Sequence, residues 1–174
     1  MQRLMGAAVL ALILSAPRAE AANGCDAFLD KLRAEAADLQ IDFTHAVVVS
    51  RAHSDTEVFD VTTKSDVDGT LTCRKDRMVR FEVHVSEPAS ARANAGFDKF
   101  ADAAVRVALG WDAAKARSTM KSMVSDAKDY YAASKERGDV YVAGKTEEHA
   151  PGGVSLGLIL TDVDRAFIIV TGGS

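Results

Sequence analysis

The stretch Met78-Val79-Arg80-Phe81-Glu82-Val83-His84-Val85-Ser86 decides the fold, because its side chains alternate in character without a break. The odd-numbered positions are apolar, and the even-numbered positions after Met78 are polar or charged. Successive side chains of a β-strand point to opposite faces of its sheet. The stretch therefore predicts a strand in a sheet with one buried and one hydrated face, as is typical of antiparallel sheets.

Shorter stretches on both sides predict the other strands of this sheet. They cover 46–49, 57–63 and 70–74 before the central strand, and 140–143, 154–160 and 166–171 after it. Asp66-Val67-Asp68-Gly69 separates the second and third strands, and an Asp-Gly pair in that position is typical of a tight hairpin, since Gly adopts positive φ at little cost. A turn around Asp162-Val163-Asp164 is predicted between the last two strands.

Three segments have the periodicity of amphipathic helices. They cover 23–40, the region from Pro88 to Gly110, and 112–137, and each repeats apolar or small side chains at spacings of three and four. Gly110 and Gly138 are expected to end helices, and Asp112 to cap one. The order α-β-β-β-β-α-α-β-β, with one further strand in the last group, predicts an α+β fold in which helices pack on one face of a mostly antiparallel sheet.

The N-terminus has the organisation of a secretory signal. Arg3 precedes an uncharged apolar run, and Ala19-Glu20-Ala21 suits a signal-peptidase site. The run is too short to cross a membrane as a helix. We expect residues 1–21 to be removed, leaving 22–174 as one periplasmic or secreted domain. Lipidation of Cys25 is the competing interpretation, and the residues before Cys25 lack the Leu that such a signal requires.

Charge and cysteine content narrow the classes of partner. The chain has 21 basic and 25 acidic residues and a formal net charge of −4, without a Lys/Arg cluster, so nucleic acid is not an expected partner. We expect no stable membrane insertion after signal removal. The two cysteines, Cys25 and Cys73, are expected to form a disulfide in an oxidising compartment. Neither lies in a C-x-x-C pair, so a structural role is favoured over a redox role.

Sequence motifs supply no catalytic set. Gly153-Val154-Ser155-Leu156-Gly157 matches the G-x-S-x-G pattern of serine hydrolases, but such an elbow lies between a strand and a helix, whereas a strand is predicted to follow here. The hydrolase order also needs a His after the Ser, and His149 is the last one. We interpret Gly157 as a bulge or a close-packing position within a strand.

The sequence predicts no metal site and no cofactor. The four histidines are scattered and share no metal-binding spacing. Asp66 and Asp68 would suit part of a calcium loop, but Lys64 and Lys75 occupy positions where such a loop needs oxygen ligands.

Four residues remain as candidates for a binding surface: Trp111, Tyr130, Tyr131 and His84. Tyr130 and Tyr131 are more simply explained as core residues of the last helix, together with Met120 and Met123. His84 is more simply explained as hydrated surface, and Trp111 as packing in an interhelix corner.

Export, a disulfide and a core without catalytic residues favour a small binding or interaction domain, with an unidentified protein or small molecule as its ligand. An exported hydrolase or metalloenzyme of unfamiliar type is the alternative, and a structural or envelope-assembly protein is the next. An enzyme is expected to show a concave site where carboxylates or His converge, and a protein binder is expected to show an exposed apolar patch.

Overall fold

The computed structural model describes residues 24–45 and 55–172. These residues form an α+β fold in the predicted order. The helices are α1 (Cys25–Glu35), the short 3-10 helix η1 (Ala37–Leu39), α2 (Ala91–Leu109) and α3 (Ala113–Arg137). The strands are β1 (Asp42–His45), β2 (Thr56–Thr62), β3 (Asp68–Arg74), β4 (Arg77–Ser86), β5 (Ala143–Ala150), β6 (Val154–Thr161) and β7 (Asp164–Thr171).

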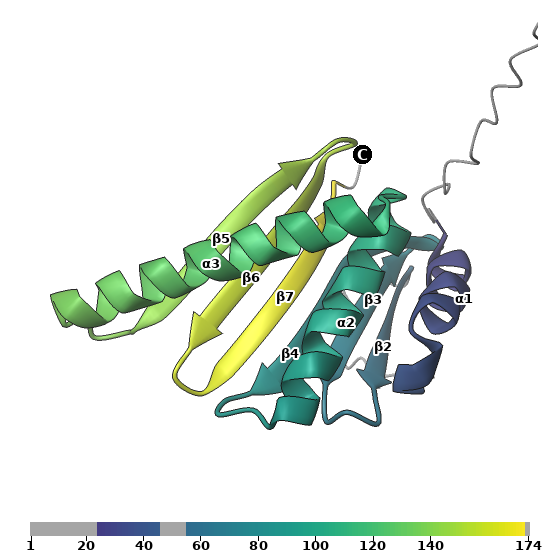
Figure 1. The fold of residues 1–174 in the computed structure, drawn as a ribbon. Coiled ribbons are helices and arrows are strands. Elements are labelled where there is room, and N and C mark those ends of the chain that lie inside the picture. The colour runs from purple at the N-terminus through teal and green to yellow at the C-terminus, as the bar shows by residue number, and fades with distance from the viewer. Residues whose placement is uncertain (1–23, 46–54, 173–174) are drawn as a thin grey trace, which may run out of the picture.

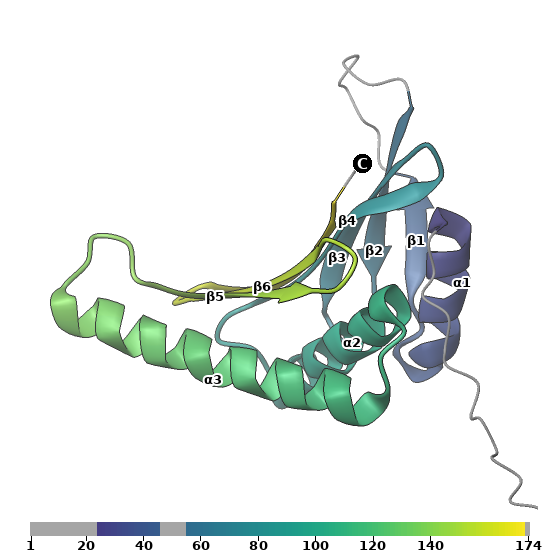
Figure 2. The same cartoon turned by 90° about the horizontal axis from the view of Figure 1, so that it is seen from above.

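The strands form a single seven-stranded sheet in the order β1-β2-β3-β4-β7-β6-β5, and every neighbouring pair is antiparallel. The helices α1 and α2 cover the β2–β4 half, and α3 runs along β5 and β6 (Figure 1). Figure 2 shows that the sheet is strongly curved and that the three α-helices lie on its convex side. The concave face carries no helix among the described residues.

The central strand β4 has the predicted alternation, and Phe81, Val83 and Val85 are buried on its helix-covered side. The Phe81 ring meets Phe28 of α1 edge to face, with ring centroids 5.3 Å apart. It meets Phe100 of α2 in the same way at 5.6 Å. One strand residue therefore joins both helices to the sheet, and each of these edge-to-face pairs adds roughly 0.5–1.5 kcal/mol beyond its buried area.

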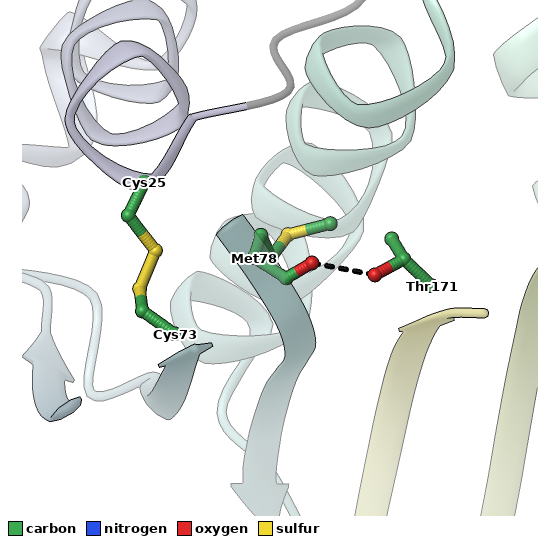
Figure 3. Close-up of a disulfide and its surroundings, with 4 residues drawn as sticks. All are labelled: Cys25, Cys73, Met78 and Thr171. Atoms are coloured by element: carbon green, nitrogen blue, oxygen red, sulfur yellow. Dashed lines mark hydrogen bonds between the residues drawn. A yellow bond between two sulfur atoms is a disulfide. The ribbon is translucent and has the colours of Figure 1, made fainter. Parts of the chain in front are cut away.

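The predicted disulfide is present between Cys25 and Cys73, whose Cα atoms lie 6.1 Å apart. It joins the first residue of α1 to β3, as Figure 3 shows. In the same view, the Thr171 hydroxyl donates a hydrogen bond to the Met78 carbonyl and so connects β7 to β4.

Caps at both ends fix the bounds of α2 and α3. The Ser90 hydroxyl accepts a hydrogen bond from the Ala93 amide at 3.1 Å, and the Asp112 carboxylate accepts one from the Lys115 amide at 2.8 Å. Gly110 and Gly138 end the two helices with φ of 62° and 70°. Left-handed backbone of this kind is favourable for glycine, so these helix ends are readable in the sequence.

The predicted hairpin at Asp68-Gly69 is wrong in its position. Gly69 lies within β3 opposite Val61, and a Cβ at Gly69 would fall 2.5 Å from the carbonyl oxygen of Glu82. Close approach of β4, and not a turn, requires glycine here. The turn is formed by residues 63–67, in which Asp66 adopts a left-handed φ of 58°.

The strand predicted at 140–143 is also misplaced, because β5 spans Ala143–Ala150. Its charged residues Glu147 and Glu148 concealed it, since an edge strand of a sheet tolerates charges that a central strand does not. The predicted strand 46–49 and the predicted signal at 1–21 lie outside the described residues.

Replacing both Cys25 and Cys73 with Ser is expected to lower the free energy of unfolding by about 2–5 kcal/mol. The disulfide closes a separation of 48 residues, and opening it restores conformational freedom to the unfolded chain. Urea titration of the double variant and of the oxidised parent measures the difference. An unchanged unfolding midpoint would contradict the role assigned to this bond.

Two glycines in neighbouring strands provide a matched pair of substitutions. A Cβ at Gly144 in β5 would fall 1.8 Å from the carbonyl oxygen of Ala127 in α3, whereas a Cβ at Gly157 in β6 would meet only Ile168 at 3.9 Å. Gly144→Ala is therefore expected to destabilise the protein by about 3 kcal/mol. Gly157→Ala is expected to stabilise it by about 0.5–1 kcal/mol, because strand glycine costs backbone entropy. Thermal unfolding of both variants measures the two changes in stability. A loss of stability in Gly157→Ala would contradict the open space assigned next to Gly157.

Candidate functional site

A polar cavity of about 510 Å³ lies between the β2–β3 turn, the end of β4 and the start of α2. Its volume falls within the range of about 300–1,000 Å³ that is typical of small-molecule sites. We term it the Asp68–His84 cavity. Its lining consists of Thr63, Asp66, Asp68, His84, Val85, Ser86, Pro88, Ala89, Ser90 and Ala93.

The sheet register places the two residues that name the cavity side by side. Asp68 of β3 is directly opposite His84 of β4, on the face of the sheet that no described helix covers. Directly opposed residues of antiparallel strands have Cβ atoms about 4.5–5.5 Å apart. Ser86 follows His84 on the same face, two residues further along β4.

The β2–β3 turn brings Asp66 to the cavity. The Thr63 hydroxyl donates to the Val67 carbonyl at 3.0 Å and accepts from the Ser65 amide at 3.2 Å. Val67 is fully buried, so the turn is anchored in the core. Asp66, between these anchored residues, is exposed at the tip.

Helix α2 holds the turn from the other side. A Cβ at Gly96 would fall 2.5 Å from the Cβ of Ser65, so only glycine lets the turn pack this closely against the helix. Arg92, one turn earlier in α2, donates a hydrogen bond to the Lys64 carbonyl. The position of Asp66 therefore depends on contacts between segments that are about thirty residues apart in the sequence.

The segment 86–90 forms the remaining wall of the cavity. The Glu87 amide donates to the Val163 carbonyl at 2.8 Å, and the Glu87 carboxylate accepts from the Ala89 amide at 2.9 Å. Asn94 of α2 donates to the Ala89 carbonyl at 3.0 Å. These bonds fix Pro88 and Ala89 as an apolar wall opposite the carboxylates.

The cavity is acidic and its hydrogen-bonding groups are available. Its lining contains two carboxylates and no Lys or Arg. Within the described residues, the side chains of Asp66, Asp68, His84 and Ser86 take part in no protein hydrogen bond or ion pair. A ligand that enters can therefore bind all four without breaking a contact of the fold.

The arrangement contains no nucleophile paired with a base. No hydrogen bond joins His84 to Ser86 or to either Asp in the part of the chain described, although covalent catalysis needs a base within reach of its nucleophile. In the same described ranges, no three His, Cys, Asp or Glu side chains are grouped so that they could hold a metal ion.

A serine and a histidine do meet elsewhere on the open face. His149 Nδ1 and Ser155 Oγ lie 3.0 Å apart across β5 and β6, and Ser155 is the serine of the G-x-S-x-G match. Both side chains belong to regular strands, and within the described chain no carboxylate orients His149. Gly157 lies within β6, as expected, but its interpretation as a bulge or close-packing position is wrong, because the strand register is regular there and a Cβ would meet only Ile168 at 3.9 Å. The His149–Ser155 pair lacks the third member that nucleophile activation requires.

The other three candidate residues do not join the cavity. Trp111 is half-buried at the α2–α3 corner, where the Lys115 ammonium lies 4.1 Å from its ring centroid. Tyr131 is half-buried and donates a hydrogen bond to Asp162, which raises the pKa of its phenol. Tyr130 is 60% exposed, so its interpretation as a core residue is wrong, whereas Met120 and Met123 are buried as expected.

Tyr130 is one of several large apolar or aromatic side chains that are individually exposed. Val140 and Tyr141, in the connection that follows α3, are also exposed. The Asp139 carboxylate accepts hydrogen bonds from Ser134 at 2.7 Å and Arg137 at 2.8 Å, which fix the start of this connection and hold the pKa of Asp139 below its usual range.

Helices α2 and α3 diverge from their shared corner (Figure 1). A second cavity, of about 220 Å³, is lined by residues of both helices and of β6 and β7. We term it the α2–α3 cleft. It is lined by Glu87, Asn94, Val124, Ala127, Lys128, Leu158, Leu160 and Arg165. Sequence reasoning missed Arg165, although the alternation Arg165, Phe167, Ile169 in β7 places an arginine on the buried face of its strand. A charged residue at a position where the strand pattern predicts burial is the signal in the sequence that could have identified Arg165.

None of the described helices is long and apolar enough to cross a membrane. A scan against protein families and searches of curated proteins and of solved structures found no match to this chain.

Proposed function

We propose that the protein is an exported binding domain without catalytic machinery, and that the Asp68–His84 cavity holds its ligand. The observation that carries this proposal is the convergence of four polar side chains that have no partner within the described protein and that line one cavity of ligand size. The disulfide is compatible with export to an oxidising compartment.

The lining favours a small organic cation as the ligand. Asp66 and Asp68 supply negative charge that no lining cation balances, and His84 and Ser86 supply further hydrogen-bonding groups. Pro88 and Ala89 offer an apolar surface for a short aliphatic stem. An amine or guanidinium on such a stem satisfies both requirements, since charge-assisted hydrogen bonds to carboxylates are the stronger class.

The presence of two carboxylates and one imidazole in the lining of a single cavity also favours the enzyme alternative over a purely structural role. The neighbouring exposed residues Val140 and Tyr141, in the connection between α3 and β5, favour a protein-interaction surface there as the second candidate function. Binding without catalysis takes precedence, because no described residue in the cavity forms a nucleophile–base pair.

Agmatine, which carries a guanidinium and an amine on a four-carbon stem, is a suitable probe for calorimetric titration. We expect agmatine to bind and inorganic phosphate not to bind, because the cavity is acidic. Asp68→Asn keeps the shape of the side chain and removes its charge, and is expected to weaken agmatine binding about tenfold. This loss of agmatine affinity is expected to become smaller as the salt concentration rises.

Asp60→Asn is the matched control. Asp60 is exposed on β2 and does not line the cavity, and its replacement removes the same charge from the protein. Equal weakening by Asp60→Asn and Asp68→Asn would show that only net charge attracts the probe. Absence of agmatine binding to the parent protein would remove the support for a cationic ligand.

A further inference from the structure

The α2–α3 cleft combines an apolar floor with positive charge. Leu158 and Leu160 of β6 and Val124 and Ala127 of α3 supply apolar lining. Its volume of about 220 Å³ is small for a site that holds a drug-sized ligand. It is large enough for one branched aliphatic or aromatic group, since an apolar cavity of about 150 Å³ holds benzene.

Arg165 lines the cleft and is held in place by the protein. Its Nε and Nη2 donate to Glu87 Oε1 at 3.2 and 2.9 Å, and Nη2 also donates to Asn94. The guanidinium carbon lies 4.8 Å from the centroid of the Phe97 ring. Only 12% of the Arg165 side chain is exposed, so the guanidinium is oriented before any ligand arrives.

Arg165 interrupts the row of buried apolar side chains that Phe167 and Ile169 form along β7. An apolar residue at 165 would continue the buried row of Phe167 and Ile169 and would fill the cleft. Replacing a buried ion pair with apolar residues is often neutral or stabilising. The fold instead keeps a space next to a charge, which is the arrangement that a binding site requires.

The residues that line the cleft carry one more positive charge than negative charge, from Arg165 and Lys128 against Glu87. Arg165 Nη1 lies 3.8 Å from Asp98 Oδ1, beyond hydrogen-bond distance, and retains donor capacity. Lys128 of α3 is exposed and forms no ion pair within the described residues. The Glu87 carboxylate is occupied by Arg165 and the Ala89 amide. Among the lining residues, two cations therefore face one carboxylate, and Asp98, which also pairs with Arg165, lies outside the lining.

We propose that the α2–α3 cleft binds a small organic acid that carries one branched or cyclic apolar group. The carboxylate contacts Lys128 and Arg165, and the apolar group lies on Leu158 and Leu160. The site is separate from the Asp68–His84 cavity and has the opposite charge preference, so neither proposal depends on the other.

Titration of the purified protein with 4-methylpentanoate, followed by NMR, tests this site. We expect saturable shifts for residues that line the cleft, and at least fivefold weaker binding of the neutral amide of the same acid, 4-methylpentanamide. Lys128→Met removes the ammonium and keeps an unbranched stem, and is expected to weaken binding of the acid about fivefold while leaving the amide unaffected.

Lys121→Met is the matched control, because Lys121 is exposed on the same helix about 10 Å from position 128. Val124→Phe fills the cleft and is expected to abolish binding of both compounds, with circular dichroism as the check on folding. The proposal would be overturned if the acid and the amide bound equally well, or if the two lysine variants had equal effects. It would also be overturned if the shifts were confined to residues outside the cleft. Tighter binding of a peptide that ends in Leu would also overturn it, because the occupant would then be a polypeptide terminus.

Discussion

The edge-to-face packing of Phe81 against Phe28 and Phe100 is the contact on which the rest of the structure depends. It fixes which face of β4 is buried, and since strand side chains alternate, it also fixes which face is open. With Phe81 inward, His84 points to the open face and stands opposite Asp68. A shift of the β4 register by one residue would bury Arg80, Glu82 and His84 together. The free energy needed to bury these charged and polar groups would exceed what core packing could offset.

The two cavities lie on either side of one short segment, 86–90, which connects β4 to α2. Ser86, Pro88 and Ala89 form a wall of the acidic Asp68–His84 cavity, while Glu87 enters the α2–α3 cleft and binds Arg165. The segment is held by hydrogen bonds to Val163, in the turn between β6 and β7, and to Asn94 of α2. This connection therefore contributes uncharged side chains to the acidic cavity and a carboxylate to the cleft.

Local patterns were sufficient to predict the elements whose periodicity reflects burial. The alternation in β4 and the apolar stripe and end residues of α3 follow from residues close in sequence. The pairing of Cys25 with Cys73 follows because the sequence has two cysteines.

Prediction failed where a distant contact decides the conformation. Gly69 resembles a turn residue, but its conformation is set by the approach of Glu82, and the edge strand β5 carries charges that resemble a loop. Tyr130 has the spacing of a core residue and is nevertheless exposed, because helical spacing alone does not reveal whether a neighbouring element covers the position. The cavity could not be predicted from the sequence, because Asp66 and His84 meet only through sheet register and the packing of Ser65 on Gly96.

The most direct test of the central claim, that this register assembles a ligand site, is amide chemical-shift mapping of the protein during titration with agmatine. We expect the shifts to concentrate in residues 63–68 and 84–93, with the His84 imidazole resonances moving at the same midpoint. Shifts concentrated at Tyr130 and Tyr141 on the α3–β5 end, or no saturable shifts anywhere, would contradict it.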